Sequence, residues 1–599
     1  MTVSLPHRDE VATEHTWDLA HICADAAAWD AEARRVEGAL PDLASFHGRL
    51  GESAGALLGW FDAWLELRVA MYKLLSYATM AFDQDTANQQ MAALRDRAIG
   101  MFSRFMAASA FAEPELLALD PAQVEAFLAA EPALGAYAHY LDNLQRRRDH
   151  VRSSEVEQLL AAAGDALSTP YSAYMMLADG DLRFADAVDG AGRPHQVARG
   201  IIGELTQSKD RALRKSAWDS YADGFLSLKN SFGSLYAGSV KSDVFLARSR
   251  GYASAIEASL SASNVPMAVY DTVIDACNRH LPTWHRYWNI RRRALGLEQM
   301  EPCDIFAPLA ESPAVSYAES VEMICAGMAP LGEEYVRIAH AGLTSGRWVD
   351  IYPNQGKANG AYSGGCYGTP PFILMNYSDS LISMSTLAHE LGHSMHSWHT
   401  NRAQPAVYSD YTLFVAEVAS NFNQAMVRSH LLAQGGTREF QIALIEEAMA
   451  NFHRYLFVMP ILAQFEQQTH AWAEAGEAVT ADRMGDLLAE LFHRGYGPAV
   501  RVDPARDGIV WAQFPHLYSN FYVYQYASGI AAANALADGV LRGAAGAAER
   551  YLQFLSAGGS RYPLDALALA GIDMTAPEAM DRAFGVMAGF VDRLEGLIG

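Results

Sequence analysis

The chain has 599 residues, and 45 Lys and Arg against 69 Asp and Glu give it a net charge of −24. This length exceeds one small core and predicts several units or a few large ones. Hydrophobic residues make up 51% and charged residues 19%, which excludes a disordered chain, and ordinary Gly and Pro usage excludes collagen-like sequences. A chain this acidic has no general attraction for nucleic acid or anionic lipid, and we expect neither as a partner.

The cysteines and the apolar stretches predict a cytoplasmic protein. Five cysteines lie far apart, without a CxxC pair, which indicates a reduced chain without a disulfide framework. The first 18 residues lack the apolar core of a secretory signal. The uncharged stretch 508–537 contains Gln, His, Asn and four Tyr, so we expect it to be a soluble segment and no membrane span.

In chain order, the first 180 residues predict one helix after another. Apolar residues recur at three- and four-residue spacing in four segments, 28–40, 54–81, 88–111 and 154–163. Leu182-Arg183-Phe184 and the turn Asp189-Gly190-Ala191-Gly192 then predict a short hairpin. We place the boundary between two lobes here, with an N-terminal helical lobe at 1–200 and a catalytic part at 201–599.

Helical periodicity resumes from Lys209 to about Leu343. The stretch from Arg347 to Tyr377 differs, because short β-prone runs are separated by Gly and Pro, which predicts a small sheet. After Ser378 the pattern is helical almost to the end. The fold class predicted is therefore mainly α.

Directly after the predicted sheet, the helical pattern contains H-E-x-x-H, with His389, Glu390 and His393. Four residues make a little over one helical turn, so the two histidines share a face and can bind one Zn²⁺. Three protein ligands would leave a fourth position for water, and Glu390 beside that face would take the water's proton. The alternative interpretation is a helix whose histidines are solvated or packed in the core.

Two residues compete as the third ligand. His399 has the spacing of the metzincin pattern, but that pattern needs a Gly where this chain has His396, so we expect the helix to continue and carry His399 away. Glu417 lies 24 residues after His393 among Val, Ala and Phe, where a carboxylate is costly unless it is paired or binds a metal. We therefore predict Glu417 as the ligand and His396 as a core or supporting histidine.

The segment 514–526 holds one His and four Tyr. Part of it is expected to be aromatic packing, while Tyr hydroxyls or His516 could stabilise an oxyanion. Tyr522 and Tyr526 are four residues apart, so on a helix they would share a face.

At this point the sequence resembles the oligoendopeptidase F group of the M3 metallopeptidases, relatives of thimet oligopeptidase and neurolysin. The resemblance runs nearly the whole length. It rests on the stretches 16–19, 40–43, 360–365, 368–376, 387–397, 414–423 and 515–529.

The resemblance implies a two-lobed neurolysin-like zincin with a small sheet beside the active-site helix and a deep central channel. It implies one Zn²⁺ per chain on His389, His393 and Glu417, with Glu390 as base. Oxyanion donors would be His516 with Tyr522 or Tyr526, while Tyr518 and Tyr524 remain open. It also implies that a Gly-rich strand binds the substrate backbone through Gly360, Ala361, Tyr362, Gly364 and Gly365.

The function predicted is a zinc-dependent endopeptidase that hydrolyses internal bonds of short oligopeptides and not folded proteins. A dipeptidyl carboxypeptidase of the same class is the alternative, and it would need a cation to hold the substrate's carboxylate. A non-catalytic helical peptide-binding protein is a third interpretation, which the complete H-E-x-x-H motif with Glu417 disfavours. Cleavage preference and oligomeric state do not follow from the sequence.

Overall fold

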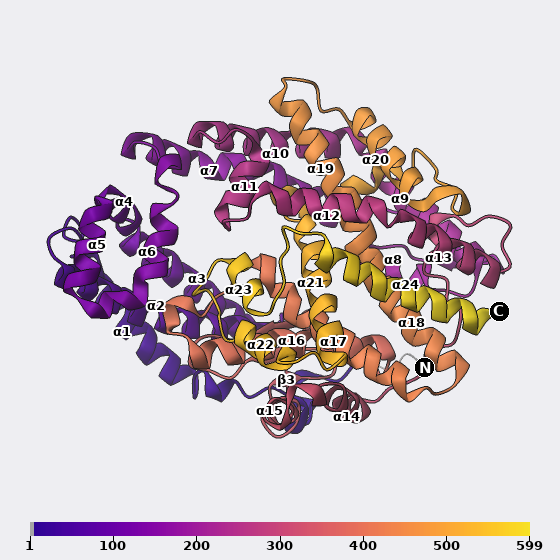
Figure 1. Cartoon of the computed structure of the whole chain (residues 1–599), viewed down its shortest axis with the longest axis horizontal. Helices are drawn as coiled ribbons and strands as arrows, with labels where there is room; N and C mark the ends of the chain where they lie inside the picture. The colour runs from indigo at the N-terminus through magenta and orange to yellow at the C-terminus, as the bar shows by residue number, and fades with distance from the viewer. Residues whose placement is uncertain (1–4) are drawn as a thin grey trace. The chain divides into compact units, whose positions relative to one another are not determined.

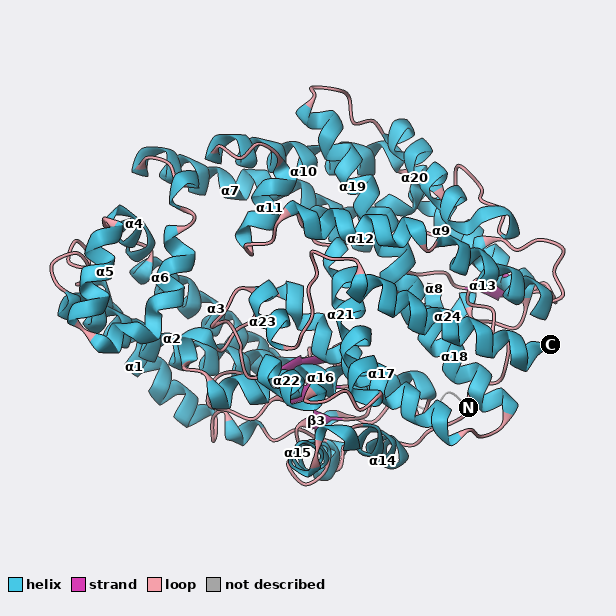
Figure 2. Cartoon of the chain, viewed as in Figure 1, coloured by secondary structure: helices cyan, strands magenta, loops and turns pink. Residues whose placement is uncertain are grey.

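A computed structural model describes residues 5–599 of the chain, and these residues are mainly helical. Figure 1 follows the chain from the helix α1 to the helix α24, and Figure 2 separates its helices from its few strands. The chain divides into two compact units, each built from three separate segments. The first unit comprises Met1–Val151, Ala314–His430 and Gly539–Gly571; the second comprises Arg152–Pro313, Leu431–Asp538 and Ile572–Gly599. The predicted boundary near residue 200 cuts the chain into two continuous parts, whereas each of these units combines three separate segments. That boundary therefore stays a prediction.

The first unit contains helices from each of its three segments and one small sheet. Its helices are α1 (Ala26–Ala44), α2 (Ala54–Asp83), α3 (Gln89–Ser109), α4 (Ala112–Ala118), α5 (Pro121–Ala130), α6 (Ala138–Gln145), α14 (Tyr317–Gly327), α15 (Glu333–Leu343), α16 (Leu381–Ala403), most of α17 (Leu413–Gln434), α22 (Ala547–Leu555) and α23 (Pro563–Leu569). The helices α1, α2 and α3 lie side by side (Figure 1) around Trp29, Trp60 and Leu74. The predicted helices at 28–40, 54–81 and 88–111 are confirmed to within a few residues.

The sheet of the first unit has three short strands in the order β3-β5-β4. The strand β3 (Val349–Asp350) is parallel to β5 (Phe372–Leu374), which pairs antiparallel with β4 (Tyr362–Gly364). Because β5 is central it is fully buried, and it packs on Trp17 and Leu19 from the start of the chain. Among the described residues β4 is an edge strand that pairs with β5 alone, and it contacts α16. The sheet predicted between Arg347 and Tyr377 is thus confirmed.

The second unit is built from helices around an aromatic core that includes Trp284, Trp288 and Trp511. Its helices are α7 (Ser154–Met175), α8 (Ile202–Thr206), α9 (Arg211–Ser227), α10 (Lys229–Arg250), α11 (Ala255–Ala262), α12 (Met267–Arg279), α13 (Leu281–Ala294), α18 (Arg438–His453), α19 (Met459–Glu474), α20 (Ala481–Tyr496), most of α21 (Tyr524–Leu541) and α24 (Glu578–Ile598). A π-helical turn, η10 (Arg454–Val458), joins α18 to α19.

The predicted hairpin is present, but its strands lie further along the chain. They are β1 (Ala187–Val188) and β2 (Pro194–His195), which are antiparallel. The Asp189 carboxylate closes the turn between them by accepting the backbone N–H groups of Ala191 and Arg193. Leu182 instead ends the π-helical turn η6 (Met176–Asp181).

The structure also bears on two expectations from the sequence, one about disulfide bonds and one about membrane-spanning helices. The five cysteines all lie among the described residues, and each is free. No helix within residues 5–599 is both long and apolar enough to cross a membrane.

Candidate metal centre and active site

The H-E-x-x-H motif lies in the middle of α16. The helix begins after Ser380, whose side-chain oxygen accepts the backbone N–H of Ser383 and so caps the first turn. Leu387 and Leu391 are fully buried, and they anchor α16 in the core of the first unit. His389 and His393 project from the less buried side, with 16% and 19% of their side chains exposed.

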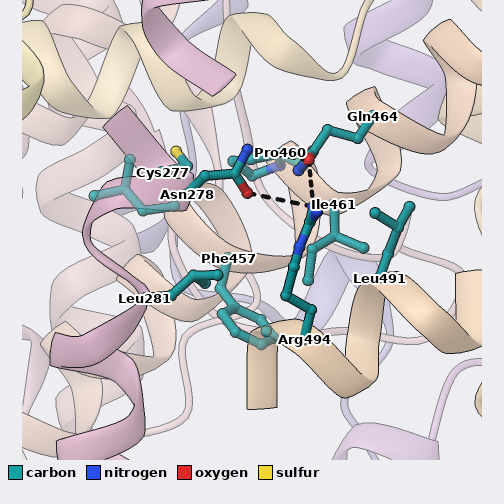
Figure 3. Close-up of a pocket in the computed structure, with 11 residues that line it drawn as sticks. Cys277, Asn278, Leu281, Phe457, Pro460, Ile461, Gln464, Leu491 and Arg494 are labelled. Carbon is teal, nitrogen blue, oxygen red and sulfur yellow. Dashed lines mark hydrogen bonds between the residues drawn. The ribbon is translucent and has the colours of Figure 1, made fainter. Parts of the chain in front are cut away.

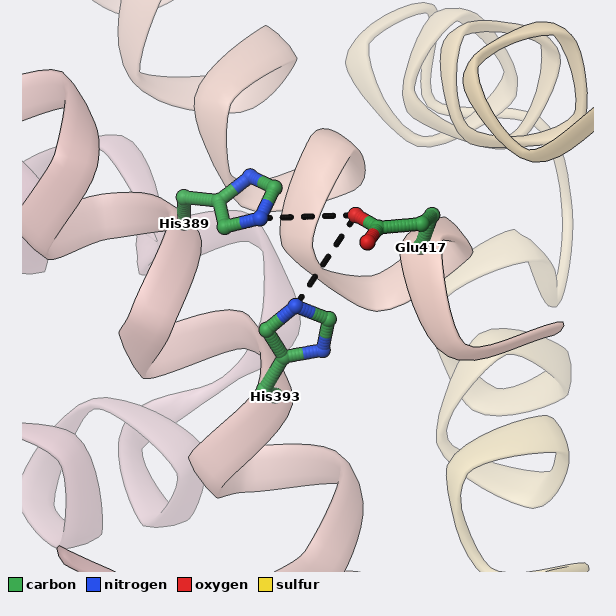
Figure 4. Close-up of side chains that lie close together, drawn as sticks. All are labelled: His389, His393 and Glu417. Atoms are coloured by element: carbon green, nitrogen blue, oxygen red, sulfur yellow. Dashed lines mark ion pairs between the residues drawn. The ribbon is translucent and has the colours of Figure 1, made fainter. Parts of the chain in front are cut away.

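The helix α17 brings Glu417 to the two histidines, as Figure 4 shows. The Glu417 Oε2 atom is 3.4 Å from Nε2 of His389 and 3.8 Å from Nε2 of His393. Ligands of a tetrahedral zinc ion, at bond lengths of about 2.0–2.2 Å, lie roughly 3.3–3.6 Å from one another. The first separation lies in this range and the second exceeds it by about 0.2 Å, so a shift of a few tenths of an ångström would let two imidazoles and a carboxylate hold a zinc ion, with one position left for water.

Gly392, inside the motif, permits this close approach. A Cβ atom at this position would lie 2.4 Å from the Ala419 carbonyl oxygen and 2.6 Å from Cα of Ser420, both in the backbone of α17. Such separations are well inside van der Waals contact, so only glycine lets the two helices come this close. The H-E-x-x-H motif does not specify the residue at position 392, and the need for glycine there follows only from the packing of α16 against α17.

Further contacts orient the three groups. The Gln424 side chain donates to Ser385 and therefore offers its oxygen to Nδ1 of His389, 3.1 Å away. This leaves Nε2 of His389 free of hydrogen and directed at Glu417. A hydrogen bond from His393 to the Ala416 backbone acts in the same way, and Ser420 Oγ donates to Glu417 Oε2 at 2.9 Å. Burial lowers the pKa of His393 to about 4, so its ring is neutral, which is the form that binds metal.

Glu390 lies beside this group and is 7% exposed. Burial raises the pKa of its carboxyl group, and the Glu417 carboxylate acts in the same direction. The backbone N–H of Ser363, in β4, hydrogen-bonds to Glu390 and partly offsets this shift. The edge strand and the expected general base are therefore in direct contact.

The Gly-rich segment runs through β4. Gly360 and Gly365 have φ angles of 84° and 125°, which favour glycine and set the turns at either end of the strand. The Tyr362 hydroxyl donates to Asp83, so this side chain is tied to α2, while Ala361 and Gly364 are half-buried. The Ser363 N–H points at Glu390 and away from β5. The backbone N–H groups of successive strand residues point to opposite sides of the strand, so those next to Ser363 point towards β5.

The two other histidines of α16 take no part in the group. The ring of His396 stacks on Tyr411 at 3.7 Å, and this residue is 1% exposed. The ring of His399 stacks on Tyr335 at 5.9 Å, and α16 continues past it to Ala403, as the sequence predicted. Within the described residues the potential metal-binding group of His389, His393 and Glu417 therefore includes neither.

The segment with the predicted oxyanion donors belongs to the second unit. It forms short 3₁₀ turns, and α21 begins only at Tyr524, so Tyr522 precedes the helix and does not share a helical face with Tyr526 as predicted. Their hydroxyls are nevertheless 2.9 Å apart, and the His516 ring is 6.2 Å from the Tyr522 ring and 6.0 Å from the Tyr526 ring. These three side chains form one cluster.

The other two tyrosines of this segment have different surroundings. Tyr524 is 2% exposed and packs on Tyr270 with ring centres 5.3 Å apart. Tyr518 packs on Tyr174 at 4.6 Å. Tyr524 is therefore a core aromatic residue, whereas Tyr518 is only half-buried and its hydroxyl has no hydrogen-bond partner among the described residues.

A buried carboxyl group that sequence analysis missed supports this cluster. Glu466, on α19, is 0% exposed, and its Oε1 atom accepts the backbone N–H of Phe521 at 2.7 Å. Phe521 has a φ of 49°, which is uncommon for a bulky residue and needs such support. Tyr522 follows directly. The sequence gives no clear signal for it, because Glu466 follows the apolar residues 461–463 and Phe465 but is followed by Gln467 and Gln468.

Comparison with known proteins agrees with this geometry. The profile described as "Peptidase family M3" matches residues 204–586, and that described as "Oligopeptidase F" matches residues 115–184. Oligopeptidase PepF of Bacillus subtilis (strain 168) is 36% identical over 596 residues, which is 99% of this chain and 89% of that protein. Group B oligopeptidase PepB of Streptococcus agalactiae is 34% identical over 593 residues, covering 99% of this chain and 98% of PepB.

Solved structures give the same result. The crystal structure of oligoendopeptidase-F from Enterococcus faecium matches with a TM-score of 0.75 and 30% identity, covering 95% of this chain and 98% of that one. A solved chain from Chlamydophila abortus matches with a TM-score of 0.91 and 31% identity, covering 99% and 100%. The chain therefore belongs to peptidase family M3, as a metalloendopeptidase of the oligoendopeptidase F group.

Proposed function

We propose that this protein is a zinc-dependent endopeptidase that cleaves internal bonds of short peptides. The observation that carries the proposal is the group of His389, His393 and Glu417 at zinc-ligand separations, with the buried Glu390 beside it. When bound, a zinc ion would act as a Lewis acid towards water and towards the scissile carbonyl group.

In this proposal Glu390 is the general base. Its carboxylate accepts a proton from the attacking water and passes that proton to the nitrogen of the leaving amine. The low exposure of the site excludes bulk water from the carboxylate, and the Ser363 N–H holds one of its oxygens in place.

The substrate would bind as an extended strand. On the side away from β5, β4 has no partner strand among the described residues, although Glu390 occupies the Ser363 N–H, and a peptide that adds there gains backbone hydrogen bonds without regard to its sequence. We assign this contact to Gly360, Ala361, Tyr362, Gly364 and Gly365. Glycines at the strand ends let a peptide backbone approach closely.

His516, Tyr522 and Tyr526 are assigned as donors to the oxyanion that forms at the scissile carbonyl. Burial lowers the pKa of His516, with the charge of Arg454 in the same direction, so its ring is a neutral N–H donor. Replacing the main donor, as in Tyr526→Phe or Tyr522→Phe, should lower kcat about 10²–10³-fold with little change in KM. Normal kinetics in both variants and in His516→Ala would limit this segment to packing.

The test of the function is Glu390→Gln. This change keeps the size of the side chain but removes the proton acceptor, so activity should fall about 10²–10⁴-fold or more while zinc stays bound. Glu333→Gln, at an exposed position of α15, is the matched control and should retain full activity. Substantial turnover by pure, zinc-loaded Glu390→Gln would refute the assignment.

The products distinguish the proposed activity from its alternative. Mass spectrometry of a digested peptide mixture should show cuts at internal bonds, whereas uniform release of C-terminal dipeptides would indicate a dipeptidyl carboxypeptidase. A cytoplasmic location stays a prediction from the unpaired cysteines, and oligopeptides are the proposed partners.

A further inference from the structure

The first unit contains a buried group of three charged side chains that the proposed chemistry does not use. Asp350, in β3, is 1% exposed, and its two carboxylate oxygens accept the two terminal nitrogens of Arg8, at 2.8 Å and 2.5 Å. The side-chain nitrogen of Lys357 lies 2.7 Å from the same carboxylate, and this side chain is 0% exposed. Because charged side chains are almost never buried so completely unless they are paired, the three depend on one another.

The second unit offers a contrast. The cavity drawn in Figure 3 encloses about 10 Å³, room for one water at most. The charged residue of its lining, Arg494, is exposed and donates to the side chains of Gln464 and Asn278. An exposed guanidinium group is hydrated, so it does not need a charged partner, whereas the buried Lys357 does.

Lys357 links the strand β3 to the segment that leads into β4. Besides the Asp350 carboxylate, it donates to the backbone carbonyl groups of Asp350 and Tyr352, at 3.2 Å and 2.8 Å. An ammonium group has three N–H donors, so these three acceptors match it. Burial lowers the pKa of Lys357, and the Asp350 carboxylate opposes that shift. The side chain therefore bridges the loop between the two strands.

Two further contacts hold the same segment. The Ala358 N–H donates to the carbonyl oxygen of Asp83, the last residue of α2, at 2.9 Å. Asn376, two residues after β5, donates to the carbonyl oxygens of Ala358 and Gly360, at 2.9 Å each. The residues just before β4 are thus fixed by α2, by β3 through Lys357, and by the end of β5.

Arg8 connects the ion group to the start of the chain. The residues after Arg8 run beside β3, where the Ile351 N–H donates to His15 and the Asp18 N–H donates to Arg347, both at 3.0 Å. In the strand order β3-β5-β4, this segment covers the β3 side of the sheet, and β4 is the open edge among the described residues. The start of the chain therefore contributes to the sheet that carries the proposed substrate strand.

We propose that Arg8, Asp350 and Lys357 are positioning residues that hold β4 in place for substrate, so that this buried ion group sets the affinity for a peptide backbone. The inference rests on the proposed function, in which an extended peptide adds to β4. An edge that is already held in its binding conformation loses less conformational entropy when a peptide binds, so fixing it tightens binding. None of the three is a proposed metal ligand or base, so they act on binding and not on the chemical step.

Lys357→Met tests this role. Methionine is apolar and of similar length, and the change leaves Asp350 paired with Arg8, so no buried charge loses its last partner. KM for an extended peptide should rise about tenfold, with kcat and zinc affinity within about twofold of the wild type. Peptide affinity, measured in the background of Glu390→Gln, should fall by the same factor. Backbone amide hydrogens of 358–365 should exchange faster in the variant, as followed by mass spectrometry.

Two changes at Arg8 approach the group from its more exposed side. Arg8→Met leaves Asp350 paired with Lys357 and should raise KM in the same direction. Arg8→Lys keeps the charge and should recover most of the affinity, although it cannot form both hydrogen bonds. Thermal unfolding and zinc content confirm that each variant is folded and loaded.

The matched control is Lys215→Met in the second unit. This change removes a lysine from Asp219 and Glu301, which it contacts at 3.0 Å and 2.9 Å, and it should leave KM unchanged. A normal KM in both Lys357→Met and Arg8→Met, or a fall in kcat larger than the rise in KM, would overturn the positioning role alone. Absence of cleavage of any peptide by the zinc-loaded wild type would instead overturn the proposed function.

Discussion

Each of the three grouped side chains has a second contact that limits its rotation. Gln424 holds His389, the Ala416 backbone holds His393, and Ser420 holds Glu417. Gln424 is seven residues after Glu417, about two helical turns, so both face α16 from one side of α17. The protein itself thus orients the three side chains, which would lower the cost of binding a metal ion.

The third ligand can be tested by two alanine variants. Glu417→Ala leaves two imidazoles, which should hold zinc at least about 100-fold more weakly, because zinc sites in enzymes use three protein ligands. His399→Ala should leave zinc affinity unchanged, since His399 stacks on Tyr335 outside the group. Zinc content after dialysis and competition with a chelator measure both. Zinc loss in His399→Ala with retention in Glu417→Ala would instead support the metzincin arrangement.

Glu466 predicts a pH effect on stability. Burial raises its pKa well above the ordinary 4.5, and Asp243 adds to the shift, so the folded protein keeps this carboxyl protonated where the unfolded chain ionises. The stability that it contributes is therefore full below about pH 4.5 and is lost as pH rises towards the raised pKa. Glu466→Gln keeps an acceptor for Phe521 but does not titrate. Its Tm minus that of the wild type should therefore increase between pH 5 and pH 8.

Melting curves at pH steps measure this difference, with the exposed Glu333→Gln as control. For the control the difference should be constant across the range. A constant difference for Glu466→Gln as well would show that Glu466 is ionised in the folded protein.

At the scale of elements, the metal centre depends on how closely α16 and α17 pack. Gly392→Ala should disturb this packing, because the new Cβ atom meets backbone atoms of Ala419 and Ser420 that cannot rotate away. Overpacking of this kind typically costs about 1–3 kcal/mol, and here it also moves Glu417 from the histidines. We expect a lower Tm, weaker zinc binding and reduced kcat.

The control for this variant is Gly589→Ala on α24, where an added Cβ atom meets nothing within 4 Å. That change should leave zinc binding intact and raise stability by up to about 1 kcal/mol, because Ala favours helix over Gly. Full zinc affinity and activity in Gly392→Ala would mean that the two helices can separate without displacing the ligands.

Local patterns account for what the sequence predicted correctly. Apolar spacing identified α1, α2 and α3, and the alternation of β-prone runs with Gly and Pro identified the sheet. The motif spacing selected His389 and His393, and a charge in apolar surroundings selected Glu417; the structure brings these side chains together, and their role as metal ligands stays a proposal.

The features that were missed depend on contacts between distant residues. Gly392 matters only because Ala419 lies against it, and Ser363 contacts Glu390 only after the sheet has formed. The helical face expected for Tyr522 and Tyr526 was wrong, because 3₁₀ turns and the positive φ of Phe521 delay the start of α21. Periodicity cannot show such a turn, since it is held by a hydrogen bond that the Phe521 N–H donates to Glu466, 55 positions away.

At the scale of the whole chain, the proposed chemistry draws on both interleaved units. The proposed metal ligands and the edge strand lie in the segment Ala314–His430 of the first unit, and the proposed oxyanion donors lie in the second. The residues before 152 carry no catalytic side chain in the proposal, but they supply the first unit's largest apolar cluster, around Trp29 and Trp60. In the predicted two-lobed fold, such helices wall a deep channel that admits only extended chains.

Substrate length tests that prediction. A peptide that adds to β4 must be extended, at about 3.3–3.6 Å per residue, and a folded domain cannot present such a strand. We expect efficient cleavage of peptides of roughly 5–20 residues, an estimate from that reach, and a falling rate for longer ones. The measurement is kcat/KM across a length series built around one cleavable core, with casein and a folded globular protein alongside and Glu390→Gln as the inactive control. Efficient digestion of either protein, or a rate that does not fall as the peptides lengthen, would show that the N-terminal helices do not restrict access.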